Sequence, residues 1–255
     1  MSAQAPLVIL FDLDDTLFQH SESVAAGVLA HRRSHHGPLA DADDDLEFAR
    51  WQQLEELHYD RYLSGELGFL DQRRARARDF VAPFDLDLRT DAAADAWFAA
   101  YIAEYRRTWR LHDDALASLD ALTAAIPGVR FGVITNSVMA VQIDKLESIG
   151  LAPRLEHVIA SGDFGVAKPD ARIFHHACEA FGVEPAETVY VGDRVGTDAI
   201  GAAAAGLLGV WICRGRTPVE AETARASEAG VLIVASLREL PLLLAGDQRA
   251  ENFSA

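Results

Sequence analysis

The chain has 255 residues, half of them hydrophobic, and a formal net charge of −16 at pH 7. This length and composition allow one large core or two unequal ones, and the negative charge disfavours a nucleic acid polymer as a partner. No apolar run approaches the roughly 18 residues that span a bilayer, so we expect no membrane partner.

Six short and mostly apolar runs alternate with helix-length segments along most of the chain. The runs are residues 7–11, 130–135, 157–160, 188–191, 209–213 and 231–235. Continuous apolar runs of this length are typical of strands that are buried on both faces. Their alternation with helices predicts an α/β fold with a parallel, Rossmann-like sheet.

The interval between the first two runs is much longer than a simple crossover needs. Residues 19–110 contain no convincing strand but several amphipathic helical segments. These segments are residues 21–33, 45–63, 70–81 and 90–110. We therefore expect a helical domain at 19–110, inserted into a core formed by 1–18 and 111–255.

Two later helices have recognisable ends in the sequence. Ser137 is placed to cap a helix at 138–149, and Asp170 is placed to open one at 171–181 that stops at Gly182. The last residues, 246–255, are expected to form a loose tail.

Polar residues gather where four of the predicted strands end. They are Asp12, Asp14 and Asp15 after the first run, Thr135 and Asn136 at the second, Lys168 in the loop after the third, and Asp193 and Asp198 after the fourth. Parallel strands bring these ends to one edge of a sheet, where ligands bind. Three adjacent carboxylates repel one another unless a cation or proton is present, and an all-oxygen ligand set suits Mg²⁺.

These residues carry a family resemblance. The motifs DLDDTL at 12–17, TN at 135–136, KP at 168–169 and GDRVGTD at 192–198 occur in the order found in the haloacid dehalogenase superfamily of hydrolases, which the chain resembles. The insert lies where this family places a helical cap of the C1 type. FDLDDTLF, with Asp15 where many relatives carry Gly, resembles the branch that contains pyrimidine nucleotidases and acylneuraminate phosphatases.

The resemblance implies a Mg²⁺-dependent phosphomonoester hydrolase that acts on a small phosphorylated metabolite, a nucleotide or a sugar phosphate. In such phosphatases the first aspartate, here Asp12, attacks phosphorus and forms an aspartyl-phosphate. The second, here Asp14, protonates the leaving group and then activates water. Mg²⁺ is expected at Asp12, at the backbone carbonyl of Asp14 and at Asp193.

The remaining motif residues receive supporting roles from the same resemblance. Thr135 and Lys168 are expected to act in catalysis by binding phosphoryl oxygens. Asn136 and Thr16 are expected to take part in substrate binding. Asp198 is expected to orient Lys168 or a metal-bound water.

The lysine count adds an argument that is independent of the family. The chain contains only Lys145 and Lys168 against 21 arginines, so a lysine at 168 indicates a need for a compact point charge. No lysine occurs in 19–110, which disfavours the relatives that cleave carbon–phosphorus bonds through a Schiff base. Asp14 favours an oxygen leaving group over a halide, which needs no proton.

The insert offers candidates for substrate recognition, each with a structural alternative. Arg73, Arg74, Arg76 and Arg78 lie within six residues, and Arg74 is the candidate for a second anionic group of the substrate. The alternative is a solvated face that pairs with nearby Asp and Glu.

Aromatic and histidine side chains of the insert have similar alternatives. The aromatic residues Trp51, Tyr59, Tyr62 and Phe69 could stack on a base or a sugar, or form a core. His31, His35 and His36 could suggest zinc, but no nearby cysteine supports it, and a solvated histidine cluster is the alternative.

Two other functions are compatible with the same residues. They are a phosphomutase of the same fold and a catalytically silent binding or regulatory protein that uses Asp12 as a phospho-acceptor or metal site. The two cysteines and an N-terminal apolar run without a preceding basic region indicate a cytoplasmic protein. We expect a monomer or homodimer.

Overall fold

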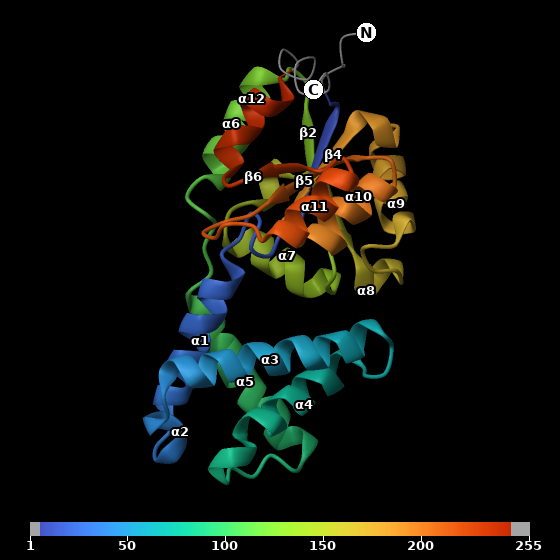
Figure 1. Ribbon diagram of the computed structural model, residues 1–255. Helices are drawn as coiled ribbons and strands as arrows, with labels where there is room; N and C mark the ends of the chain where they lie inside the picture. The colour runs from blue at the N-terminus through green and yellow to red at the C-terminus, as the bar shows by residue number, and fades with distance from the viewer. Residues whose placement is uncertain (1–5, 246–255) are drawn as a thin grey trace. The chain divides into compact units, whose positions relative to one another are not determined.

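The computed structural model describes residues 6–245 (Figure 1). The chain divides into two compact units. One is formed by the residues up to Gln19 together with those from Arg110 onward, and the other is His20–Trp109. The tail expected at 246–255 lies outside the described residues.

The first unit contains a parallel sheet, which has six strands within the described residues (Figure 1). The strands are β1 (Val8–Phe11), β2 (Arg130–Thr135), β3 (His157–Ala160), β4 (Thr188–Gly192), β5 (Leu208–Ile212) and β6 (Leu232–Val234). Each lies within one residue of its predicted ends, and the predicted α/β, Rossmann-like class is confirmed. The order β3-β2-β1-β4-β5-β6 reverses direction between β1 and β4, which is where open α/β sheets bind ligands.

Helices and short helical turns lie between these strands and after the last of them. They are α6 (Ala115–Ala125), α7 (Met139–Ser148), η2 (Ala152–Arg154), α8 (Ser161–Phe164), α9 (Ala171–Phe181), η3 (Pro185–Glu187), the π-helix η4 (Val195–Ile200), α10 (Gly201–Ala204), α11 (Glu220–Glu228), η5 (Leu237–Glu239) and α12 (Leu240–Leu244). Among residues 6–245, none is long and apolar enough to cross a membrane.

The predicted ends of α9 are confirmed, whereas the predicted cap of α7 is wrong. The Asp170 side chain accepts a hydrogen bond from the backbone of Arg172, and α9 stops at Gly182 in the left-handed conformation. Ser137 does not cap α7, which begins one residue later than expected, after Val138. The backbone N–H of Met139 instead donates to Asp163 at 2.7 Å, so a residue remote in sequence caps this helix.

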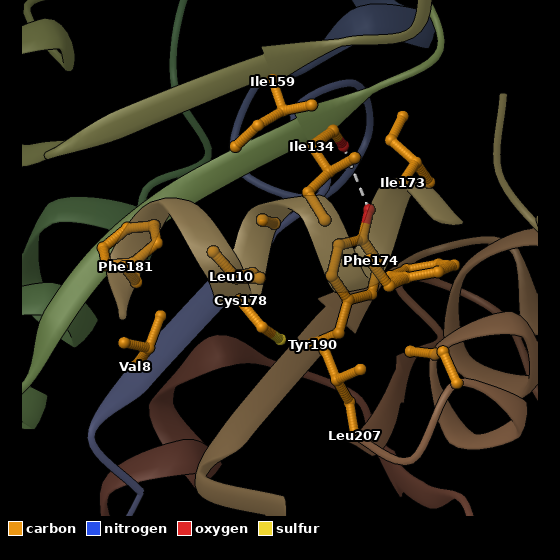
Figure 2. Close-up of a cluster of buried hydrophobic side chains, with 13 residues drawn as sticks. Val8, Leu10, Ile134, Ile159, Ile173, Phe174, Cys178, Phe181, Tyr190 and Leu207 are labelled. Carbon is orange, nitrogen blue, oxygen red and sulfur yellow. Dashed lines mark hydrogen bonds between the residues drawn. The ribbon is translucent and has the colours of Figure 1, made fainter. Parts of the chain in front are cut away.

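A buried hydrophobic cluster fixes α9 against the sheet (Figure 2). Val8 and Leu10 of β1 and Tyr190 of β4 occupy alternating positions, so they share the sheet face that Phe174 and Phe181 of α9 cover. Burial of each large apolar side chain contributes about 1.5–3 kcal/mol. This packing fixes the ends of the strands, and therefore the residues that follow them.

The second unit is helical. Its elements are α1 (His20–Ser34), α2 (Pro38–Asp41), α3 (Asp44–Leu63), α4 (Phe69–Val81), η1 (Ala82–Phe84) and α5 (Asp91–Arg107). Trp51 is fully buried and packs on Phe80 and Tyr101, with ring centroids 5.0 and 4.6 Å away. Trp51 therefore belongs to the core of this unit, as the structural alternative predicted.

His31 is buried in the same aromatic core. Only 3% of His31 is exposed, and its ring centroid lies 4.5 Å from that of Trp97 and 4.9 Å from that of His35. The expectation of a solvated histidine cluster is therefore wrong for His31. Burial, and then the neighbouring His35, lower the pKa of His31 to about 4, against a smaller opposing effect of Glu104.

We expect acid to destabilise the helical unit through His31. Because its folded-state pKa lies below the ordinary value of 6.5, the unfolded state binds the proton preferentially, and stability falls as the pH drops below that value. Between pH 7 and about pH 5 the free energy of unfolding should fall by about 2 kcal/mol. Denaturant unfolding should show a smaller fall for His31→Phe, whereas His36→Phe, at an exposed neighbour, should behave as wild type. Equal falls in all three proteins would contradict this cause.

Candidate active site

Three aspartates meet at the carboxyl ends of β1 and β4. Phe11 pairs with Val191 in the sheet, and the backbone N–H of Asp12 donates to Val191 at 2.8 Å. Asp193 follows β4 directly, and Asp198 lies on η4. One carboxylate oxygen from each of the three aspartates lies within 4.8 Å of the other two, which is close enough for one cation to be shared.

Lys168 lies among these carboxylates. Its Nζ donates to Asp12 Oδ1 at 2.6 Å, to Asp198 Oδ1 at 2.8 Å and to the Tyr190 hydroxyl at 2.6 Å. Only 2% of its side chain is exposed. Burial lowers the pKa of Lys168, but the charges of Asp12 and Asp198 outweigh this effect and raise it above the ordinary value. The lysine is therefore a fixed positive charge.

The single positive charge of Lys168 does not neutralise the negative charges of the three aspartates. Burial raises the pKa of Asp12 to about 7, with Lys168 opposing and Asp198 and Asp14 adding to the rise. Burial, then Asp12 and Asp198, raise the pKa of Asp193 to about 8. A divalent cation would favour the ionised forms, and the carboxylate oxygens suit Mg²⁺. The residues present therefore fit this metal.

Asp198 is held from both sides by the protein. Its Oδ1 accepts from Lys168, and its Oδ2 accepts from the backbone N–H of Arg194 at 3.0 Å. A Cβ atom at Gly192 would lie only 2.4 Å from the Asp198 side chain, so this approach of η4 to β4 requires glycine. The geometry suits the expected role of Asp198 in orienting Lys168.

Asn136 fixes the loop that carries Lys168. Its Nδ2 donates to the Lys168 carbonyl at 3.0 Å, and its Oδ1 accepts from the Lys168 N–H at 2.8 Å. The sequence suggested a contact with substrate, whereas these bonds show a contact with the protein backbone. The amide of Asn136 therefore positions Lys168.

Thr135 ends β2 and is oriented by α7. Its Oγ1 accepts a hydrogen bond from Gln142 Nε2 at 3.3 Å, and both residues are buried. Because Gln142 is the donor, the hydroxyl hydrogen of Thr135 remains available for another acceptor. A phosphoryl oxygen is the expected acceptor.

Thr16 lies in the turn after Asp14. The preceding residue, Asp15, has φ 59°, a left-handed conformation that favours glycine but that aspartate tolerates. Thr16 is fully buried, and its hydroxyl has no hydrogen-bond partner among the described residues. Its carbonyl accepts from Arg214 at 2.9 Å. A substrate contact would require this hydroxyl to become accessible, so the buried Thr16 does not fit the expected role in substrate binding.

Arg74 belongs to the helical unit. Its guanidinium donates to Asp95 at 2.8 and 2.7 Å and also pairs with Asp71 and Asp91, each at 3.1 Å. These contacts match the alternative of a face that pairs with nearby acids. The guanidinium of Arg74 is therefore paired within its own unit.

Lys145 and Gln142 were not predicted to lie in the site. Lys145 Nζ donates to Asp14 Oδ1 at 2.5 Å, while Gln142 contacts Thr135. A signal for Lys145 existed, because it is one of only two lysines in the chain. Nothing in the sequence distinguishes Gln142 from an ordinary helix residue.

Comparison with known proteins shows the family of the chain. The sequence model of the haloacid dehalogenase-like hydrolases matches residues 7–206. The chain belongs to this family. The family predicted from the four motifs is confirmed.

Curated relatives include several phosphatases. Glyceraldehyde 3-phosphate phosphatase of Methanopyrus kandleri is 30% identical over 218 residues, which are 82% of this chain and 84% of that protein. Phosphoserine phosphatase of Thermus thermophilus is 39% identical over 127 residues, half of each chain. N-acylneuraminate-9-phosphatase of Mus musculus is 35% identical over 136 residues, 52% of each. These relatives confirm the predicted enzyme class, a phosphatase of this family.

Solved structures share the fold. The HAD-hydrolase YfnB from Bacillus subtilis, solved bound to magnesium, has a TM-score of 0.76 and 19% identity, with coverage of 94% of this chain and 99% of that one. A dehalogenase solved as an intermediate complex has a TM-score of 0.72 and 22% identity, covering 95% of this chain and 98% of its own. At these identities the likeness shows the fold alone.

Proposed function

We propose that this protein is a Mg²⁺-dependent phosphomonoester hydrolase that acts on a small phosphorylated metabolite, a sugar phosphate or a nucleotide, through an aspartyl-phosphate on Asp12. The observation that carries the proposal is the shared contact of Lys168 with Asp12 and Asp198, beside Asp193. The names of the relatives support small phosphorylated substrates.

The first half-reaction transfers the phosphoryl group to Asp12. Lys168 holds Asp12 Oδ1, which leaves Oδ2 to form the new bond to phosphorus while the bond to the leaving oxygen breaks. Asp14 gives its proton to that oxygen, so the substrate departs as an alcohol. Thr135 donates its hydroxyl hydrogen to a phosphoryl oxygen.

The second half-reaction hydrolyses the aspartyl-phosphate. Asp14, now ionised, takes a proton from a water molecule as the water oxygen bonds to phosphorus. The bond between phosphorus and Asp12 breaks, inorganic phosphate leaves, and Asp14 is protonated again. Mg²⁺ would be held by Asp12, Asp193 and the backbone carbonyl of Asp14, and it would screen the charges of nucleophile and phosphate.

Phosphate release from 4-nitrophenyl phosphate tests the proposal. Wild type should turn over with Mg²⁺ and lose activity in chelator. Asp193→Asn should raise the Mg²⁺ concentration for half-maximal activity at least about 10-fold, because loss of even an outer partner of a metal ligand costs that much. Asp120→Asn, at a side chain that is 70% exposed on α6, should match wild type.

Three results would count against the proposal. Full turnover in chelator would remove the metal assignment. A folded wild type that releases no phosphate from aryl, sugar and nucleotide esters would favour the silent binding protein. Transfer of phosphate between two positions of a sugar, without its release, would identify a phosphomutase.

A further inference from the structure

Lys145 is a buried cation that the mechanism above does not use. It lies on α7, and only 3% of its side chain is exposed. Its Nζ donates to Asp14 Oδ1 at 2.5 Å and lies 4.5 Å from the centre of the Phe18 ring. All three residues belong to the α/β unit. Burial of an ammonium is costly unless it is paired, so the contact with Asp14 accounts for a lysine at this position.

The position of Lys145 on its helix supports a role in the site. Gln142 and Lys145 are three residues apart, and residues at this spacing share a helix face. Both are buried, and both donate to groups of the proposed mechanism, Gln142 to Thr135 and Lys145 to Asp14. One face of α7 therefore contributes two polar side chains to the site.

We propose that Lys145 is a positioning residue for proton transfer by Asp14, an inference that rests on the proposed function. An ammonium group only donates hydrogen bonds. While Asp14 Oδ1 accepts the hydrogen bond from Lys145, the proton that Asp14 gives to the leaving group is carried by Oδ2. Lys145 thereby fixes which carboxyl oxygen transfers the proton and restrains the rotation that would exchange the two oxygens.

The proposal predicts a loss that depends on the leaving group. An alkyl phosphate needs a proton on its leaving oxygen, whereas 2,4-dinitrophenolate leaves without one. Lys145→Met should lower kcat/KM for an alkyl phosphate about 10- to 100-fold and change it less than about 3-fold for 2,4-dinitrophenyl phosphate. Because kcat/KM depends only on the steps up to phosphoryl transfer to Asp12, comparing wild type and variant by kcat/KM isolates the first half-reaction.

A double variant separates positioning from a general structural role. If Lys145 acts through Asp14, adding Lys145→Met to a protein that already carries Asp14→Asn should not lower kcat/KM for the alkyl phosphate any further. Ile143→Ala is the matched control, because Ile143 is 44% exposed on the same helix, and it should keep wild-type kcat/KM for both esters. An equal loss with both esters, or a further loss when Lys145→Met is added to Asp14→Asn, would overturn the role of Lys145.

A second measurement needs no turnover, and it tests the contact between Lys145 and Asp14 even if the Lys145→Met variant folds poorly. Protein labelled with ¹⁵N at the lysine Nζ contains only two labelled groups, Lys145 and Lys168. Asp14→Asn should change the chemical shift of the Lys145 ammonium much more than that of the Lys168 ammonium. An unshifted resonance would overturn the contact in solution. Absence of turnover of both esters by wild type would overturn the proposed function itself, and this role with it.

Discussion

Asp12→Asn should abolish phosphate release and, without metal, make the protein more stable. The loss of turnover should be on the order of 10⁴-fold or more, as for loss of a nucleophile that forms a covalent intermediate. The gain in stability follows from burial and from Asp198 and Asp14, which together outweigh Lys168 and raise the pKa of Asp12 to about 7. The uncharged amide of an asparagine at position 12 avoids the free-energy cost of keeping an ionised carboxylate buried there.

The sign of this effect depends on pH. The folded-state pKa of Asp12 lies above the ordinary value of 3.8, so the folded state binds the proton more tightly than the unfolded state. The destabilisation of the folded state by ionised Asp12 therefore appears as the pH rises from about 4 and is complete above about 7. In chelator, Asp12→Asn should gain on the order of 2–4 kcal/mol at pH 8 and much less at pH 5.

Denaturant unfolding in chelator and phosphate release with Mg²⁺ measure the two effects separately. Asp120→Asn serves again as the control for an aspartate outside the site and should change neither. Wild-type turnover in Asp12→Asn would refute the nucleophile. A less stable Asp12→Asn protein at pH 8 would refute the charge argument while leaving the nucleophile in place.

Lys168→Met should have the opposite effect on stability. It removes the cation that contacts Asp12 and Asp198 and leaves two buried carboxylates without it. Breaking a buried ion pair by removing one partner costs about 3–5 kcal/mol. Turnover should fall at least about 100-fold, as for loss of a group that stabilises transition-state charge.

Three further measurements make this prediction specific. Mg²⁺ should restore part of the stability of Lys168→Met, because the ion compensates the same carboxylates. Lys168→Arg should also lose stability, since a guanidinium is larger than the enclosed ammonium. Asp12→Asn combined with Lys168→Met should be more stable than Lys168→Met alone, because the two groups interact directly. A Lys168→Met protein as stable as wild type would contradict the charge balance described above.

The sequence by itself determined the strands and the family. Continuous apolar runs set β1 to β6 within one residue, because strands buried on both faces need such runs. Asp12, Thr135 and Asp193 stand where three of these strands end, and Lys168 lies in the loop after β3. The four motifs that contain these residues, in their order along the chain, carry the resemblance to the family. Helical periodicity likewise placed α1, α3, α4 and α5, because one face of each must be apolar to pack.

Only the tertiary structure decided which polar side chains contact one another. Asp14 and Lys145 are 131 residues apart, and no local pattern says which face of α7 covers the ends of the strands. The same holds for Asp163, which caps α7 where Ser137 was expected, and for Gly192, where Asp198 leaves no room for a side chain. Hydrophobic burial follows the local order of residues, whereas hydrogen bonds between remote groups depend on how helices pack on the sheet, and packing is a property of the whole fold.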